Sequence, residues 1–212
     1  VIFEPTASRS LASYQTTRHH LILNVMEDVK SSILVATAGK HGWAQKPLQG
    51  APKFSTASAD AIDAQESDDY FMKVSGFLEP ASLLMGRTGG KAPEKLKQAP
   101  SFFDASGLEV SQHFATSKDG TRVPYFQVSP KSLKLDGTNP TLLYGYGGFE
   151  VSLTPEYDGD TGRQRGIGRA WLTQGGVYVV ANIRGGGEYG PKWHQAALKQ
   201  NRHRAYEDFA AV

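Results

Sequence analysis

An uninterrupted apolar run, VYVVANI, occupies residues 177–183. A run without polar alternation is typical of a strand that is covered on both faces, as in a parallel sheet. Glycines bound the run on either side, at 175–176 and at 185–187, and they indicate turns at both ends. Such a strand needs helices to cover it.

Two segments with helical character flank the run. Pro191 opens one of them, which continues to Val212 without a stop signal. The apolar stretch TLLY at 141–144 predicts a buried strand ahead of both segments. The order strand, helix, strand, helix predicts parallel crossovers and an α/β fold. Residues 161–174 form the other segment, with apolar side chains spaced for one helical face at Ile167, Ala170, Trp171 and Leu172.

An antiparallel hairpin is expected before these elements. Residues 109–117 alternate in polarity, and residues 122–128 form the return strand. Asp119-Gly120 lies between them and predicts the two-residue turn that a right-twisted hairpin prefers. The hairpin makes the predicted sheet mixed, although most of it is parallel.

The first hundred residues have a different pattern, with short segments rich in β-branched and aromatic residues. A shift of about 50 residues places His20 on Tyr70 and Ile33 on Leu83, and this period falls in the range of propeller blades. Two such units are too few to close a ring, so we expect further blades upstream of this chain. A generic antiparallel sandwich is the alternative. The segments lie at 19–25, 31–37, 69–76 and 81–88.

A boundary is predicted near residue 105. Residues 91–107 contain prolines, lysines and small residues, which together are typical of a linker. We therefore expect propeller blades plus linker at residues 1–103 and an α/β domain at residues 104–212.

Composition excludes several classes of site and partner. The chain has no cysteine, which excludes disulfides, thiolate zinc sites and cysteine nucleophiles. The net charge is only +2, and the basic clusters at 163–169 and 199–204 lack regularly interleaved aromatics, so they predict solvated helix faces and no nucleic-acid partner. Neither a membrane span nor a signal peptide is visible, and the compartment stays unassigned. We expect no cofactor and no metal.

The loop GYGGF follows the strand at 141–144. Ligands of open α/β sheets lie beyond the carboxyl ends of the strands, so this loop is expected on the functional edge. Gly145, Gly147 and Gly148 allow a close backbone approach or a positive φ, and Tyr146 could present its hydroxyl to a bound ligand. The alternative is a tyrosine that caps the sheet edge and only satisfies its hydroxyl.

Three long motifs occur in a fixed order: SKDGTRVPYF at 117–126, LLYGYGGFEVSLTPEY at 142–157, and the whole stretch from Gly175 to Val212. In this order they resemble the prolyl oligopeptidase family of serine peptidases. The resemblance is strong from about residue 111 onward. The two blade-like units, which begin at FEPTASRSLASYQTT, resemble the end of that family's seven-bladed propeller.

The resemblance implies an α/β-hydrolase domain that hydrolyses short peptides by acyl transfer at a serine, with cleavage after proline favoured over cleavage after basic residues. It implies that Tyr146 donates a hydrogen bond from its hydroxyl to the oxyanion. Phe149 matches a family aromatic that lines the substrate cleft near the proline-binding pocket. The expected partners are a short peptide and the remaining C-terminal catalytic segment.

The chain contains no G-x-S-x-G and no S-x-x-K motif. The resemblance places the catalytic Ser, Asp and His beyond Val212, so we expect these residues alone to be inactive. His194 and His203 lie nine positions apart, which fits no familiar metal signature, and we interpret them as surface or packing residues. Glu207 and Asp208 are interpreted as residues that decorate a helix.

Two other functions remain open. Gly185, Gly187 and Gly190 fit G-x-G-x-x-G between a strand and a helix, the context of a dinucleotide site. That site also expects an acidic residue about twenty positions on, at the end of a second strand, and none is predicted there. The preferred interpretation of the loop is a tight glycine turn held by an ion pair of Arg184. The third possibility is a non-catalytic fragment that binds peptide or a partner chain.

Overall fold

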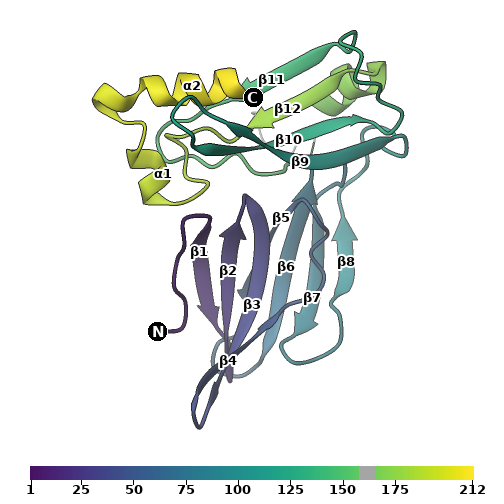
Figure 1. The fold of residues 1–212 in the computed structure, drawn as a ribbon. Coiled ribbons are helices and arrows are strands. Elements are labelled where there is room, and N and C mark those ends of the chain that lie inside the picture. Colours follow the sequence, from purple (N-terminus) through teal and green to yellow (C-terminus); the bar gives the residue numbers. More distant parts are fainter. Residues whose placement is uncertain (158–165) are drawn as a thin grey trace. The chain divides into compact units, whose positions relative to one another are not determined.

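The computed structural model describes residues 1–157 and 166–212 (Figure 1). It divides into two compact units. The first consists of Val1–Gly76 and Pro80–Pro100, and the second of Phe77–Glu79 and Ser101–Val212. Among the described residues, no helix has both the length and the apolar character needed to cross a membrane.

The first unit contains two four-stranded antiparallel sheets, each a simple meander. The first sheet is formed by β1 (Arg9–Thr16), β2 (His20–Glu27), β3 (Lys30–Gly39) and β4 (Gly42–Pro47). The second is formed by β5 (Ser55–Ala61), β6 (Asp69–Gly76), β7 (Ser82–Arg87) and β8 (Glu94–Gln98). This architecture is consistent with propeller blades.

The predicted 50-residue repeat corresponds to equivalent strands of the two sheets. β2 and β6 are each the second strand, and β3 and β7 each the third. Their registers differ by one residue, because Ile22 faces Val35 while Met72 faces Leu84. The repeat therefore arises from two copies of one inner hairpin.

The outer strands were not predicted. β4 and β8 are exposed along their whole length, so neither carries an apolar pattern. The prediction of a linker over residues 91–107 is wrong for β8, which forms the edge of its sheet. β5, STASADA, is built from small residues, and its Ala57 and Ala59 are buried because the two sheets pack closely at this strand.

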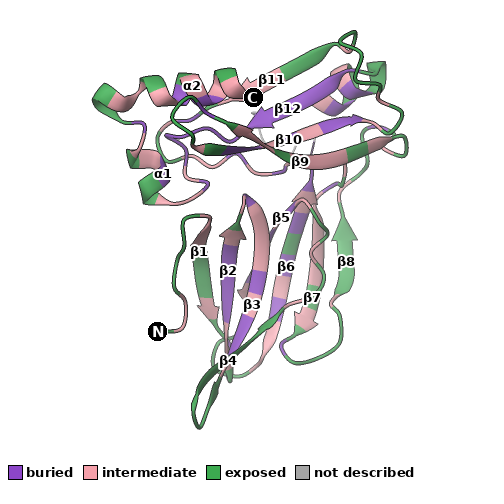
Figure 2. Ribbon diagram, viewed as in Figure 1, coloured by how far each residue is buried: buried purple, intermediate pink, exposed green. Residues whose placement is uncertain are grey.

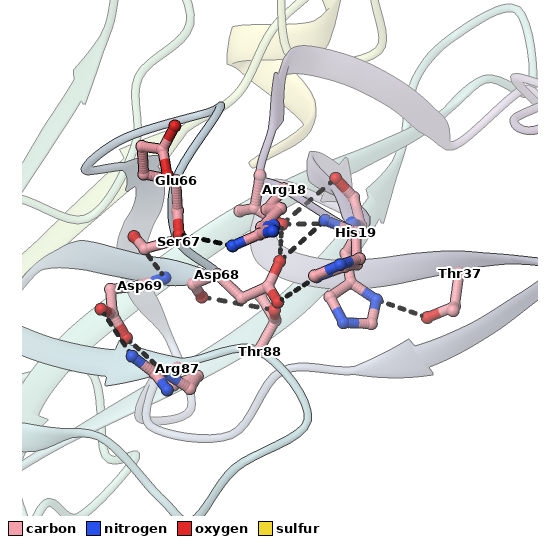
Figure 3. Close-up of polar contacts among 11 residues, drawn as sticks. Arg18, His19, Thr37, Glu66, Ser67, Asp68, Asp69, Arg87 and Thr88 are labelled. Carbon is pink, nitrogen blue, oxygen red and sulfur yellow. Dashed lines mark hydrogen bonds and ion pairs between the residues drawn. The ribbon is translucent and has the colours of Figure 1, made fainter.

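Polar contacts also join the two sheets. Asn24 donates from Nδ2 to the Ala59 carbonyl (3.1 Å) and accepts from the Ala59 N–H (2.9 Å). At one end of the sheets, Asp68 receives hydrogen bonds of 2.8 Å from the Thr17 hydroxyl and the His19 N–H, and its other oxygen lies 2.8 Å from His19 Nδ1 (Figure 3). Burial alone would raise the pKa of Asp68, but the hydrogen bonds of His19 and Thr17 lower it to about 2.

The second unit contains one mixed sheet in the order β11 (Thr141–Gly145), β12 (Val177–Ala181), β10 (Arg122–Pro130), β9 (Leu108–Thr116). The parallel pair of β11 and β12 and the antiparallel hairpin of β9 and β10 agree with the prediction. β10 and β12 are also antiparallel, so the prediction that most of the sheet is parallel is wrong for the described strands. β12 is buried at all five residues, which confirms the interpretation of the apolar run (Figure 2). β11 is less buried than predicted because it has one neighbour in this sheet, and Leu142 is exposed.

The hairpin turn is longer than predicted. The Gly120 N–H bonds to the Ser117 carbonyl (2.9 Å), and the Ser117 N–H bonds to the Thr121 carbonyl (2.8 Å). Gly120 has a φ of 82°. The loop is therefore a three-residue connection, in which a tight turn is followed by a left-handed glycine.

The predicted helices are shorter than expected. Residues 161–165 of the first lie outside the described residues, and the rest forms a π-helical turn, η1 (Ile167–Trp171), followed by a 3₁₀ turn, η2 (Leu172–Gln174). Gly175, at φ 83°, ends it as predicted. The segment after Pro191 is broken into α1 (Pro191–Gln195), η3 (Lys199–Asn201) and α2 (His203–Ala211).

The break in the last segment has a structural cause. Leu198 is extended, and Lys199 has a φ of 50°, so the helix cannot continue through them. The two sides of the break then both reach the core, where Ala197 and Ala205 pack with Ala181 and Ile183.

Candidate functional site

Two glycine-rich loops lie at the same edge of the mixed sheet, because each follows a strand of the parallel pair β11 and β12. They pack backbone to backbone. A Cβ on Gly147 would lie 2.7 Å from the Ile183 side chain and 2.8 Å from the Arg184 carbonyl, and Gly147 has a φ of 55°. A Cβ on Gly185 would clash with the Gly147 carbonyl. Glycine is therefore required on both sides of this contact.

The other glycines of the first loop have different roles from those predicted. A Cβ on Gly145 would lie 2.9 Å from the Phe209 ring, so this glycine makes room for α2 and not for a ligand. Gly148 is uncrowded, with its nearest neighbour, Tyr146 Cε1, at 3.8 Å. Of the three glycines, only Gly147 has a positive φ, which favours glycine at this position.

Tyr146 lies in this loop with 43% of its surface exposed. It is therefore not sealed within the aliphatic core. No described residue provides a hydrogen-bond partner for its hydroxyl, so the edge-capping alternative has no contact to support it. Phe149 is 85% exposed. Both side chains predicted for the site are thus accessible on the surface of this unit.

The loop is strained just after Tyr146. Phe149 and Glu150 have φ values of 52° and 56°, in the left-handed region that costs a residue with a Cβ about 1–2 kcal/mol. The Glu150 N–H is 3.3 Å from the Gly185 carbonyl and 3.1 Å from His194 Nδ1, and the Val151 N–H bonds to the Gly148 carbonyl (3.0 Å). These contacts keep the backbone in this conformation, and strain of this kind concentrates at functional sites.

A cavity of about 700 Å³ lies beside the strained residues. Apolar groups of Ala197 and Leu198 and the cationic side chains of Lys199 and Arg202 contribute to its wall. The remaining lining residues are Gly148, Phe149, Glu150 and His194.

Arg184 forms the predicted ion pair, and with two carboxylates instead of one. Its guanidinium contacts Asp208 at 2.6 and 2.9 Å and Asp119 at 2.5 and 3.1 Å. The Asp208 side chain is fully buried, so the interpretation of Asp208 as a surface residue of the helix is wrong. The hydrogen bond from Arg184 holds the pKa of Asp119 well below its usual range. The network ties the hairpin turn, the end of β12 and α2 together.

Glu188 is a buried carboxyl group that the sequence analysis did not assign to a role. Its Oε1 accepts hydrogen bonds from the Leu153 N–H (3.0 Å) and Asn182 Nδ2 (3.3 Å), and the residue is 1% exposed. Burial raises the pKa of Glu188 to about 7, because the charged carboxylate loses its hydration in the interior. The only local sequence feature that marks Glu188 is its place directly after three consecutive glycines.

The two histidines differ. His203 is exposed, with Nδ1 3.0 Å from the Gln200 carbonyl, which agrees with its interpretation as a surface residue. His194 is partly buried and contacts both glycine-rich loops, since its Nδ1 also lies 2.7 Å from the Gly185 carbonyl. The sequence analysis missed this role of His194.

The dinucleotide hypothesis fits the structure poorly. The space beside Gly185 is occupied by the Gly147 carbonyl, and that beside Gly187 by the Glu150 carbonyl and the Ser152 hydroxyl. The segment after Gly190 is a helix of five residues. The glycines of this loop therefore serve contacts within the chain.

Known proteins share this sequence and architecture. The sequence profile of the prolyl oligopeptidase family, peptidase family S9, matches residues 167–212. An uncharacterized peptidase, y4nA, of Sinorhizobium fredii is 46% identical over 212 residues, which is 100% of this chain and 28% of that protein. A prolyl endopeptidase of Elizabethkingia miricola is 37% identical over 162 residues, which is 76% of this chain and 22% of that protein.

Comparison with solved structures gives the same result over almost the whole chain. A post-proline cleaving enzyme from Rickettsia typhi superposes with a TM-score of 0.80 and 32% identity, covering 99% of this chain and 29% of that one. The chain thus spans less than a third of the length of these relatives. From its motifs, its sequence relatives and its fold, the chain belongs to the prolyl oligopeptidase family of serine peptidases.

Proposed function

We propose that the chain is part of a serine-type oligopeptidase that hydrolyses short peptides by acyl transfer, with cleavage after proline. Family membership supports this proposal, and so do the names of the relatives, which include a prolyl endopeptidase and a post-proline cleaving enzyme. Because the sequence contains no G-x-S-x-G, the serine, aspartate and histidine that react with the peptide come from polypeptide outside these residues.

In this proposal the chain contributes to two domains. Residues 104–212 form the first part of an α/β-hydrolase domain, whose sheet begins with β9, β10, β11 and β12. Residues 1–103 contain the last blades of a propeller that restricts access to short substrates. The meander topology and the mixed sheet with a central buried strand support this assignment.

Tyr146 is the proposed oxyanion donor. When the nucleophile attacks the scissile carbonyl, negative charge develops on its oxygen, and a fixed hydrogen-bond donor stabilises that charge by roughly 3–4 kcal/mol. The observation that carries this role is an exposed tyrosine at the carboxyl end of the parallel pair, in a loop whose backbone is held in a strained conformation.

Phe149 is the proposed apolar wall of the substrate pocket. Its ring is almost fully exposed and lies at the cavity lined by Ala197 and Leu198. An apolar wall favours a compact ring such as that of proline, because burial of the ring removes apolar surface from water.

The test is the substitution Tyr146→Phe in a full-length peptidase that contains these residues. The change removes only the hydroxyl, so kcat on a proline-containing chromogenic peptide is expected to fall by about 100- to 1000-fold with little change in KM. Tyr14→Phe, at an exposed tyrosine of β1, is the control and should leave kcat unchanged. Unchanged turnover of the Tyr146 variant would remove it from the mechanism.

A second measurement concerns these residues alone. Without a nucleophile they are expected to show no turnover of the same peptide, even at high protein concentration. Hydrolysis by the isolated chain would contradict the proposal, since the reacting groups would then lie within it. Binding of the peptide without hydrolysis in the full-length protein would favour the non-catalytic alternative.

A further inference from the structure

His194 lies between the two glycine-rich loops. Its Nδ1 is 2.7 Å from the Gly185 carbonyl of one loop and 3.1 Å from the Glu150 N–H of the other. The same carbonyl also lies 3.3 Å from the Glu150 N–H. His194 Nδ1, the Gly185 carbonyl and the Glu150 N–H therefore lie within hydrogen-bonding distance of one another. Glu150 has a φ of 56°, which is one of the strained values of the loop.

Arg202 makes a second contact to the same loop. Its Nη1 donates to the Gly147 carbonyl, directly beside Tyr146. The guanidinium also lies over the Tyr206 ring, 5.5 Å from the centroid, which limits its movement. His194 lies in α1 and Arg202 directly precedes α2, and each contacts a backbone group of the loop that follows β11.

We propose that His194 and Arg202 are positioning residues, which hold Gly147, Phe149 and Glu150 in the left-handed conformation and so fix the directions of Tyr146 and Phe149. This inference rests on the proposed function of that loop. Neither side chain reacts; each acts through the backbone of the loop.

The glycine contacts alone do not suffice for this task. Gly147 and Gly185 allow the loops to approach, but they have no side chain that could oppose relaxation of Phe149 and Glu150 to a negative φ. A residue in the left-handed region persists only where its surroundings enforce it. The bonds from His194 and Arg202 to both ends of the strained stretch provide that restraint.

The chemistry of His194 gives a specific test. With the proton on Nδ1, the ring donates to the Gly185 carbonyl; with the proton on Nε2, Nδ1 accepts from the Glu150 N–H. Both neutral forms use Nδ1. The amide of an asparagine can occupy the place of Nδ1, whereas the amide of a glutamine lies nearer to the place of Nε2.

In the full-length peptidase, His194→Ala is expected to lower kcat by about 10- to 100-fold, because a misplaced donor stabilises the oxyanion less well. His194→Asn should keep most of the activity and His194→Gln should not. His203→Ala is the matched control at an exposed histidine and should leave kcat unchanged. Equal loss in the Asn and Gln variants would overturn the role of Nδ1.

Arg202→Gln has its own control in Arg204→Gln, since Arg204 also donates to a main-chain carbonyl, that of Ala196, but away from the loop. Arg202→Gln is expected to lower kcat, and Arg204→Gln is not. Adding His194→Ala to Tyr146→Phe should cost less than the two losses combined, because both changes act on one donor. Additive losses would mean that His194 does not act through Tyr146.

A readout that needs no catalysis separates the two proposals. Hydrogen exchange at the amides of Glu150 and Val151 should speed up at least tenfold in His194→Ala, while exchange in β12 stays unchanged. If Tyr146→Phe retains full kcat but exchange responds, the assignment of Tyr146 fails and the positioning role stands. If exchange at the Glu150 and Val151 amides is unchanged in His194→Ala, and exchange in β12 shows that the variant is folded, the inference is overturned.

Discussion

Two polar clusters join distant parts of the chain, and they differ in their contact with water. In the first unit, Asp68 is bonded to His19, whose side chain is 62% exposed. In the second unit, Arg184 is bonded to Asp119 and Asp208, and its side chain is only 4% exposed. Both clusters satisfy the hydrogen-bonding groups of their carboxylates. Hydrogen bonds of similar length therefore have unequal energetic consequences, because water can replace His19 but cannot reach the place of Arg184.

The strongest test of this difference is Arg184→Met. It leaves the buried Asp208 carboxylate without a cation, and removal of one partner of a buried pair typically costs about 3–5 kcal/mol. The free energy of unfolding from urea titrations should fall by that amount. Adding Asp208→Leu should restore much of the loss, because the uncompensated charge is then gone. If the free energy of unfolding of Arg184→Met falls by less than about 1 kcal/mol, Asp208 is not left as a buried charge without a partner.

Glu188 extends the comparison to a buried carboxyl group that forms no ion pair with any described residue. Because its pKa is raised to about 7 in the folded state and is about 4.3 in the unfolded chain, the folded state binds an additional proton between these values. Stability should therefore fall by about 3 kcal/mol as the pH rises from about 4 through the folded-state pKa, and it should level off above about pH 8. Glu188→Gln should abolish this component of the pH dependence. Identical curves of unfolding free energy against pH would show that Glu188 is not the group responsible.

The smallest effect is expected at Asp68→Asn. Since hydrogen bonds lower the pKa of Asp68 to about 2, its contribution is present above the unfolded pKa near 4 and is lost as the pH falls through 2. An exposed partner limits the pair to about 0.2–1 kcal/mol, measured as the shift in unfolding free energy at pH 7. His19→Ala should have a similar effect. A cost as large as that of Arg184→Met would remove the distinction between the two clusters.

The sequence predicts several elements of the fold because they depend on local periodicity. The apolar run of β12, the inner hairpins of both blade-like sheets and the Pro191 start of α1 are each marked by residues within about ten positions. β4 and β8 could not be predicted, because their exposed residues have no apolar alternation and their strands are defined by the neighbour that they pair with.

The sequence also predicts only part of the candidate site. Tyr146 and Phe149 were identified from a motif, and both are accessible in the structure. The prediction that Gly145 approaches a ligand was wrong, because Phe209 lies against it. The roles of His194 and Glu188 were not predictable, since each depends on partners 44 and 35 positions away in the chain.

Residue order alone was enough to indicate the family motifs, the glycine turns and the two-sheet repeat, since each depends on residues that are close together in the sequence. Three-dimensional packing was needed to show that Arg184 binds two carboxylates, one of them 65 positions away, and that the last helical segment is broken between Ala197 and Ala205, which pack into one core. The physical reason is that the free energy of a buried charge or a strained backbone depends on which atoms surround it, and those atoms come from distant segments.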